Sequence, residues 1–152
     1  MRKENIIDAI NMKKYSTHIE ILNDLFGRKY KGHQKASVQI NDRVWIWFPK
    51  FLKDKLGNIK VAPSGWQNVY NDDFSVITTK PPVSKKTTNE KKIVLIFAML
   101  EPQEYTFLGA YKNDIINSNE YAHYYLKITD KVKLIGDYVD KIELIIEDSK
   151  YF

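Results

Sequence analysis

Tryptophans and cations, two kinds of side chain with binding chemistry, gather in the first half of the chain. Trp45 and Trp47 are two residues apart, so in an extended strand both rings point to the same side as Arg43. Bases stack on aromatic rings, and Lys or Arg side chains hold phosphates. The candidate residues of this kind are Arg28, Lys29, Lys31, Lys35, Arg43, Trp45, Trp47 and Trp66. The alternative is a Trp face that packs under N-terminal helices, with Arg43 reaching solvent at its rim.

The charge of the chain supports a basic surface in the same region. Residues 1–60 hold 13 Lys or Arg and 6 Asp or Glu, a balance of +7, whereas residues 61–152 hold 11 and 13, a balance of −2. A basic surface attracts phosphates. A solvated, Lys-rich surface with no ligand is the alternative.

A second candidate group lies in the last third of the chain. Tyr121, His123 and Tyr125 alternate along a predicted strand and share one of its faces. Imidazole and phenol groups offer hydrogen bonds beside a stacking surface, so these residues suit the lining of a ligand pocket. A half-exposed strand face with cross-strand aromatic pairs is the alternative.

Signals for catalysis are weak. Asp137, Asp148 and Lys150 have the residue types of a metal-dependent nuclease, in which carboxylates hold Mg²⁺ and a lysine orients water. The three histidines are scattered, and the sequence contains no HExxH motif, phosphate-binding loop or nucleophile elbow. We therefore expect a non-catalytic protein without a metal or another cofactor, and keep the nuclease as an alternative.

A sheet must position these candidate residues. The most clearly predicted part of that sheet is a central hairpin. Residues 92–100 are nearly all apolar, which predicts a strand covered on both faces, and residues 105–111 form the second arm. Gly109 in the middle of that arm predicts a bulge, a bend or the close approach of another backbone. A bent hairpin of this kind predicts a small, strongly curved sheet.

The remaining elements predict an α+β fold. Ile6, Ile7 and Ile10 have the spacing of a first helix, and Thr17 and Gly27 are the expected cap residues of a second, so residues 4–26 are predicted to be helical. Strands are predicted over residues 36–40, 43–48, 66–70, 74–79, 120–129 and 132–135, with Asn41-Asp42 as a turn. Residues 137–148 fit either a helix or a strand, and we favour the helix. The predicted architecture is a curved, mostly antiparallel sheet or open β-barrel with the N-terminal helices packed on it.

Length and composition indicate one domain over residues 1–152, with a β-rich part from 36 to 135 and a mobile loop at 80–91. The chain has no Cys, which excludes disulfides and thiolate metal sites. No apolar run has the length of a signal peptide or a membrane span, so we expect a cytoplasmic protein without a membrane partner.

The strand sequence Tyr105-Thr106-Phe107-Leu108-Gly109-Ala110-Tyr111, followed by Tyr124-Tyr125-Leu126-Lys127-Ile128, resembles PUA-like domains over about residues 93–129. That superfamily includes the ASCH, EVE and SRA-type modules. The resemblance implies a small, curved mixed sheet that closes into a barrel with helices at its openings, and a nucleic acid or nucleotide-like ligand in a concave aromatic pocket. The chain departs from it in lacking an ASCH signature, so no subfamily is fixed.

Together these observations favour a module that binds DNA or RNA and reads an extruded or modified base in an aromatic pocket. The main alternative is a protein-interaction module, such as a phage- or plasmid-encoded inhibitor of a host enzyme, whose exposed aromatics would anchor a protein partner.

Overall fold

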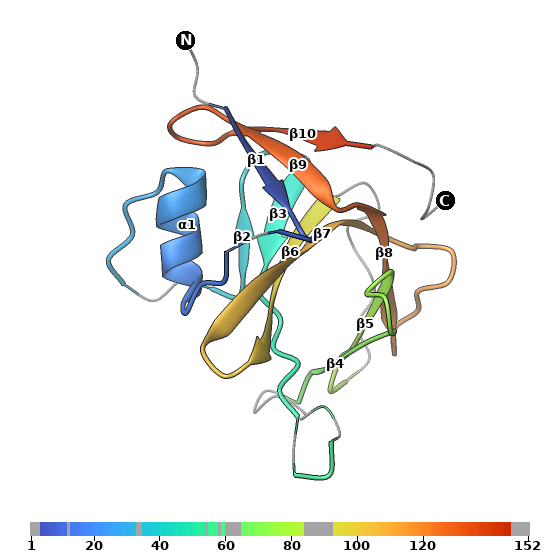
Figure 1. The fold of residues 1–152 in the computed structure, drawn as a ribbon. Helices are drawn as coiled ribbons and strands as arrows, with labels where there is room; N and C mark the ends of the chain where they lie inside the picture. Colours follow the sequence, from blue (N-terminus) through green and yellow to red (C-terminus); the bar gives the residue numbers. More distant parts are fainter. Residues whose placement is uncertain are drawn as a thin grey trace.

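The computed structural model describes residues 4–11, 13–32, 35–53, 55–57, 59, 65–83 and 93–146, and these form ten strands and one helix. A seven-stranded sheet has the order β2-β3-β6-β7-β8-β5-β4, and a three-stranded sheet has the order β1-β9-β10 (Figure 1). The elements are β1 (Glu4–Asp8), α1 (His18–Phe26), β2 (Ser37–Gln39), β3 (Val44–Trp47), β4 (Gln67–Tyr70), β5 (Val76–Lys80), β6 (Ile93–Glu101), β7 (Glu104–Asn113), β8 (His123–Thr129), β9 (Lys131–Ile135) and β10 (Lys141–Ile145). Within the larger sheet only β3 and β6 pair in parallel, so the sheet is mixed and mostly antiparallel as predicted.

The N-terminal region contains one of the two predicted helices. Thr17 caps α1 by accepting a hydrogen bond from the Glu20 amide at 3.2 Å, and Gly27 ends the helix with a φ of 68°. A Cβ at Gly27 would lie 1.7 Å from the Asp137 carbonyl oxygen, so only glycine fits there. The predicted first helix is wrong, because residues 4–8 form β1 and pair with β9.

The central hairpin is β6–β7, and Gly109 bends it as predicted. The register of β7 shifts next to Gly109 on the β6 side, and shifts again between Ala110 and Tyr111 on the β8 side. Gly109 has a φ of 126°, and a Cβ there would lie 2.6 Å from the Thr129 carbonyl oxygen. The glycine therefore supplies both a bulge and a close backbone approach.

The bend curls the larger sheet strongly. In the strand order β3 and β8 are separated by β6 and β7, which in a flat sheet would place them about 14 Å apart. The rings of Trp47 on β3 and Tyr125 on β8 nevertheless have their centroids 5.6 Å apart. The sheet therefore folds its two ends toward each other, although it stays open, with β2 and β4 as edge strands. Within the described residues the strands do not close into a barrel, so the closure that the PUA-like resemblance implied is corrected.

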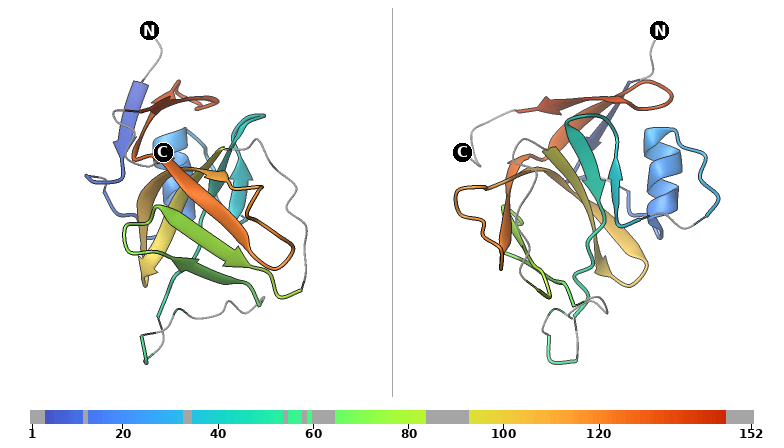
Figure 2. Two further views of the ribbon diagram at one scale, coloured as in Figure 1. Left: turned by 90° about the vertical axis from the view of Figure 1, so that its right-hand side faces the viewer. Right: turned by 180° about the vertical axis from the view of Figure 1, so that it is seen from behind.

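The outer face of the curled sheet carries the main core. Figure 2 shows α1 on the side of β2 and β3 that faces away from β4, β5 and β8, and the three-stranded sheet beside it. Fully buried side chains from α1, such as Leu22 and Phe26, join Ile46, Phe97 and Leu134 in one cluster. Phe97 is at its centre, since its ring lies within about 6 Å of three others, those of Phe26, Phe48 and Phe107.

The C-terminal part of the chain corrects a second prediction. The favoured helix over residues 137–148 is wrong, because β10 pairs with β9 and the strand alternative holds. Residues 132–135 are the middle of the second sheet, not an extension of the first. Residues 84–91 of the predicted mobile loop lie outside the described residues.

Candidate nucleic-acid interface

The inner face of the curled sheet is the surface opposite α1, and aromatic rings dominate it. We define it by Trp45, Trp47, Val94, Ile96, Tyr111, Asn113, His123, Tyr125, Lys127, Ile77, Thr79, Asn68 and Tyr70, which the strand registers place on this side. Trp47 and Tyr125 are half-buried and touch each other across the face. Phe51, which is fully buried, and Phe74 extend the aromatic cluster through contacts with Tyr70.

A polar row crosses the inner face next to the rings. Strand pairing aligns Asn68 of β4 with Thr79 of β5, and Thr79 with His123 of β8. The buried Thr79 hydroxyl donates to the Asn68 side-chain oxygen at 2.7 Å. His123 is also buried, and its ring lies 6.4 Å from that of Trp66 in an edge-on arrangement. The row thus holds an amide, a hydroxyl and an imidazole in fixed register.

The next row along the same strands is aromatic and apolar. It aligns Tyr70, Ile77, Tyr125 and Asn113 across β4, β5, β8 and β7. Burial raises the pKa of the Tyr125 phenol, and a hydrogen bond from the Asn113 side chain acts in the opposite direction. Tyr125 is therefore a neutral stacking surface at physiological pH, with a polar group held at its edge.

A buried cation closes one end of the inner face. Lys127 is 6% exposed, and its Nζ lies 2.9 Å from Asp130 Oδ1 and 5.8 Å from the centre of the Tyr111 ring. The carboxylate offsets the cost of burying the ammonium group. Lys127 is thus held in place by its surroundings, in contrast to the exposed lysines of the predicted basic surface.

Comparisons with known proteins agree on this fold. The SET and RING associated (SRA) domain family matches residues 1–134. The chain belongs to the SRA family. A search of curated proteins returned no match. Among solved structures, the 5-hydroxymethylcytosine-specific restriction enzyme AbaSI is similar, with a TM-score of 0.59 and 18% identity over 83% of this chain. The SRA chain spans 41% of the length of that enzyme.

Membership in the family confirms the predicted PUA-like resemblance, since SRA domains are part of that superfamily. SRA domains bind DNA, including modified or extruded bases, so a nucleic-acid-binding module fits this chain and a nucleic-acid partner is supported. Within the described residues no helix is long and apolar enough to cross a membrane.

The structure places the predicted tryptophan residues of the SRA domain together. Trp45 and Trp47 lie on the inner face, and Trp66 reaches it through His123. The alternative in which these rings pack under N-terminal helices does not hold, because α1 packs on the opposite face of β3, against Val44, Ile46 and Phe48.

Arg28 is not available for phosphate binding. It is 6% exposed, and its guanidinium donates to the carbonyl oxygens of Phe26 at 2.7 Å and Val139 at 3.0 Å. It also lies 3.6 Å from the centre of the Tyr138 ring. Arg28 therefore joins the end of α1 to the β9–β10 turn, and its place in the predicted phosphate-binding set is corrected.

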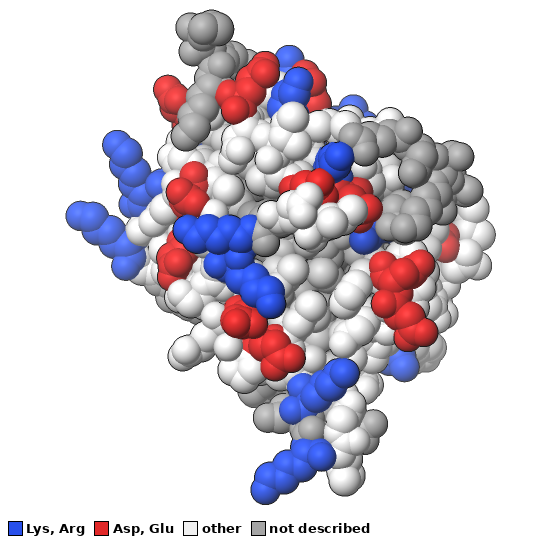
Figure 3. Space-filling view, in the orientation of Figure 1, with Lys and Arg blue, Asp and Glu red and all other residues white. Residues whose placement is uncertain are grey.

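Lys29 and Lys31 are exposed, as a phosphate contact requires, but they lie away from the tryptophans. Asn23 fixes the backbone between them through two hydrogen bonds of 2.9 Å to Tyr30. In Figures 1 and 2 the segment after α1 lies beyond the helix, on the side away from β4, β5 and β8. In Figure 3 Lys and Arg project at this margin, while elsewhere on the same view both signs of charge are interspersed.

Of the other predicted residues, some lie on the inner face and some lie outside it. Arg43 is exposed at the start of β3, on the side of Trp45, and Lys35 is exposed just before β2. Tyr121 is 67% exposed and precedes β8, whereas His123 and Tyr125 of the same predicted group lie on the inner face. Sequence reasoning missed Asn68, Thr79 and Lys127. Only Lys127 had a signal, its alternation with His123 and Tyr125.

The described residues provide no support for the nuclease alternative. Asp137 lines a small pocket of about 100 Å³ between α1 and the β9–β10 turn, together with Asn23 and Asp24. In the part of the chain that the structure describes, no group of three or more His, Cys, Asp or Glu is arranged to hold a metal ion. Asp148 and Lys150 lie outside the described residues.

Proposed function

We propose that this SRA domain binds duplex DNA, takes one base out of the helix and holds it on the inner face of the curled sheet, where a modification of the base is read. The observation that carries the proposal is the pairing of two surfaces there. The Trp47–Tyr125 contact provides a stacking platform, and the row of Asn68, Thr79 and His123 provides hydrogen-bonding groups beside it.

The energetics are consistent with this arrangement. Extruding a base from a duplex costs a few kcal/mol, and stacking a base on an aromatic ring returns about 1–3 kcal/mol. Hydrogen bonds from a buried polar row add discrimination, because a ligand that fails to pair with such groups leaves them unsatisfied. The fold shared with a 5-hydroxymethylcytosine-specific enzyme supports a modified cytosine as the base.

The test compares three otherwise identical duplexes that carry cytosine, 5-methylcytosine or 5-hydroxymethylcytosine at one position. We expect one modified duplex to bind at least about tenfold more tightly than the unmodified one, because one added methyl group in a fitted pocket is worth roughly 10–200-fold. Fluorescence anisotropy of labelled DNA gives the three dissociation constants. Equal affinities for the three duplexes would show that the protein does not read the modification of the base. An absence of binding at low salt would contradict a nucleic-acid-binding function.

A matched pair of variants locates the reading site. Thr79→Val removes the hydroxyl of the polar row and keeps the shape, so it should reduce the preference for the modified duplex. Thr78→Val is its control, because Thr78 is the neighbouring residue on β5 and lies on the opposite face of the strand, paired with Val69 and Tyr124. If both variants keep the preference of the parent, the polar row does not read the base.

A further inference from the structure

A residue with a strained backbone stands in the turn between β4 and β5. Phe74 has a φ of 59°, in the left-handed region that glycine and asparagine enter readily and that a bulky side chain opposes. The Phe74 amide donates to the Asn71 carbonyl oxygen at 3.1 Å, and the Asn71 amide donates to the Val76 carbonyl oxygen at 3.2 Å. Phe74 thus takes the left-handed position that ends a short hairpin loop, where glycine is usual. A phenylalanine in this conformation must be held by its surroundings.

A buried hydroxyl group from β7 holds this residue. Tyr111 is fully buried, and its hydroxyl donates to the Phe74 carbonyl oxygen at 2.5 Å. The two residues are 37 positions apart in the sequence, and β8 lies between β7 and β5 in the sheet. The direction of a carbonyl group follows from the backbone dihedral angles around it, so the Tyr111 hydroxyl fixes the conformation of Phe74.

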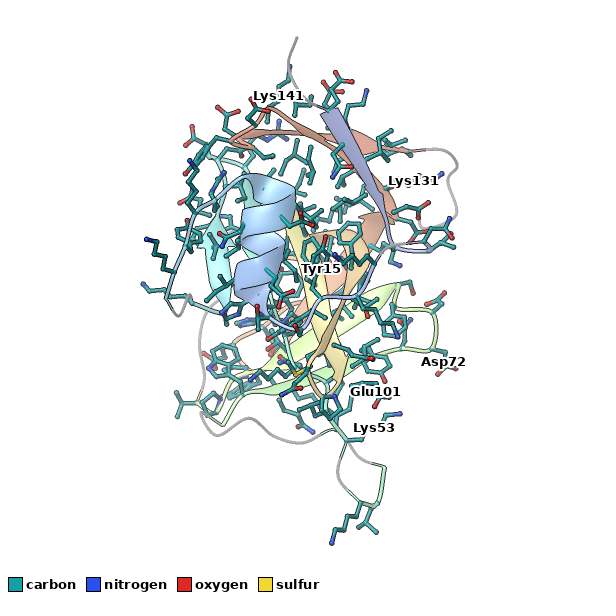
Figure 4. All side chains as sticks on the ribbon, turned by 60° about the vertical axis from the view of Figure 1, so that its left-hand side comes forward. Tyr15, Lys53, Asp72, Glu101, Lys131 and Lys141 are labelled. Atoms are coloured by element: carbon teal, nitrogen blue, oxygen red, sulfur yellow. The ribbon has the colours of Figure 1, made fainter. Side chains whose placement is uncertain are left out.

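The position of β4 depends on this turn. β4 has four residues, pairs with β5 and forms one end of the strand order. The Phe74 ring stacks on Tyr70, the last residue of β4, with the ring centroids 4.6 Å apart. In Figure 4 Asp72 marks the tip of the turn, which is exposed, whereas Phe74 is half-buried. Asn68, two residues before Tyr70, accepts the hydrogen bond of the Thr79 hydroxyl in the polar row. A change of conformation at Phe74 would therefore shift Asn68 relative to the rest of that row.

We propose that Tyr111 is a positioning residue of the base-binding site. Its hydroxyl holds Phe74 in the left-handed conformation and thereby keeps Asn68 in line with the polar row. The inference rests on the proposed function, because the polar row is where the base is read. Tyr111 is fully buried, so a bound base contacts the row that Tyr111 supports and not Tyr111 itself. Strain of this kind is kept where the surrounding structure fixes a site in advance for its ligand.

The test measures how strongly the full chain prefers a modified duplex over the unmodified one, by fluorescence anisotropy. The modified duplex carries 5-methylcytosine or 5-hydroxymethylcytosine, whichever the parent binds more tightly. Tyr111→Phe should reduce the preference by roughly fivefold, the effect of one lost hydrogen bond. Tyr105→Phe is the matched control, because it removes a phenol hydroxyl from another buried tyrosine of β7 that belongs to the outer cluster. It should change the preference by less than about twofold, whatever urea unfolding shows for its stability.

Two substitutions at Phe74 show whether the hydroxyl acts through the turn. Phe74→Gly and Phe74→Val both remove the ring, but glycine adopts the left-handed conformation readily and the β-branched valine opposes it. The preference of Phe74→Val should be lower than that of Phe74→Gly by at least about fivefold. In the Phe74→Gly background, Tyr111→Phe should reduce the preference by less than about twofold, because glycine keeps the turn without the hydroxyl.

The outcomes separate this inference from the proposed function. If Tyr111→Phe keeps the preference of the parent, or loses as much in the Phe74→Gly background as alone, the hydroxyl does not act through the turn and the inference is wrong, while base reading stands. If the parent binds all the duplexes equally, base reading fails and the inference fails with it. If Tyr111→Phe does not fold, the comparison at Phe74 decides, and equal preferences of Phe74→Gly and Phe74→Val would overturn the inference.

Discussion

The two faces of β3 differ in what covers them. On one face Val44, Ile46 and Phe48 are 5%, 0% and 3% exposed beneath α1 and the second sheet. On the other face Trp45 and Trp47 are only half-buried, although each ring has a large apolar area that a core could bury. Five consecutive residues, 44–48, thus serve two surfaces, one covered by α1 and the second sheet and one lined by rings and polar groups.

The contrast shows that one face of β3 contributes only to the folding core, whereas the other also carries the groups of the proposed base-binding site. The outer cluster is built from aliphatic and phenylalanine side chains in mutual contact, as a folding core requires. The inner face has a buried apolar cluster of its own, which includes Ile77, Ile96 and Tyr111. Beside that cluster it holds an amide, a hydroxyl and an imidazole in register, polar groups that a folding core does not need but that suit a ligand. Substitutions on the two faces should therefore have different consequences.

The largest expected effect is on the outer face. Phe97→Ala removes a fully buried ring that contacts three other phenylalanines, and should lower the free energy of unfolding by about 3–5 kcal/mol.

Trp47→Ala should lower the free energy of unfolding by clearly less than Phe97→Ala does, because the Trp47 ring is half-exposed, but it should weaken DNA binding by about 1–3 kcal/mol through the lost stack. Urea unfolding and anisotropy titrations measure the two quantities. If Trp47→Ala stays folded and binds as the parent does, the inner face is not the stacking surface.

The next effect distinguishes two pairs of exposed lysines, Lys53 with Lys55 and Lys29 with Lys31. Each phosphate contact contributes about −0.7 to −0.9 to the slope of log affinity against log salt. Lys53 and Lys55 are exposed in the loop between Phe51 and Ile59, two residues that pack in the inner-face cluster. Neutralising both lysines should flatten this slope by nearly two units with little change in base preference. Neutralising Lys29 and Lys31, which lie beyond α1, should flatten it by less than about one unit. If neutralising Lys29 and Lys31 flattens the slope more than neutralising Lys53 and Lys55, the DNA binds on the side of α1 and not at the inner face.

The smallest effect concerns alkaline pH. Burial raises the pKa of Tyr125, and Tyr15 and Tyr105 are shifted in the same direction. Since an unfolded tyrosine titrates near pH 10, the unfolded state loses its protons first, so the stability from these groups is complete below about pH 10 and declines above it. Tyr125→Phe should make the decline above about pH 10 slightly shallower in urea unfolding. An unchanged decline would mean that Tyr125 is more exposed than the structure shows.

The parts of the fold that the sequence predicted are those with local signals. The Thr17 cap, the Gly27 terminus, the Asn41-Asp42 turn and the Gly109 bulge each depend on residues a few positions apart. β1 and β10 were predicted as helices because their apolar residues, Ile6 to Ile10 in one and Ile142 to Ile146 in the other, form runs too short to distinguish the two periods. What decided for strands was pairing with β9, which lies more than 120 residues after β1.

In the candidate site, too, the sequence predicted the groupings that depend on local signals and missed those that depend on contacts between distant segments. Alternation along one strand was sufficient to group Trp45 with Trp47 and His123 with Tyr125, and the structure keeps both pairs on one surface. Neighbours in sequence were a poor guide to neighbours in space, because α1 turns Arg28 and Lys29 away from the strand that follows them. The row of Asn68, Thr79 and His123 depends on registers between strands far apart in the chain, which no local pattern specifies.

One measurement tests the central claim, that a base of the DNA rests on the inner face, most directly. All three tryptophans of the chain, Trp45, Trp47 and Trp66, lie on or beside this face, so tryptophan emission, excited selectively over that of tyrosine, reports on it. A titration with labelled 5-hydroxymethylcytosine duplex should follow DNA anisotropy and tryptophan emission in the same sample. Our account predicts that emission changes in parallel with binding, more with the modified duplex than with the unmodified one at equal saturation. A saturating rise in anisotropy with no change in tryptophan emission would contradict it.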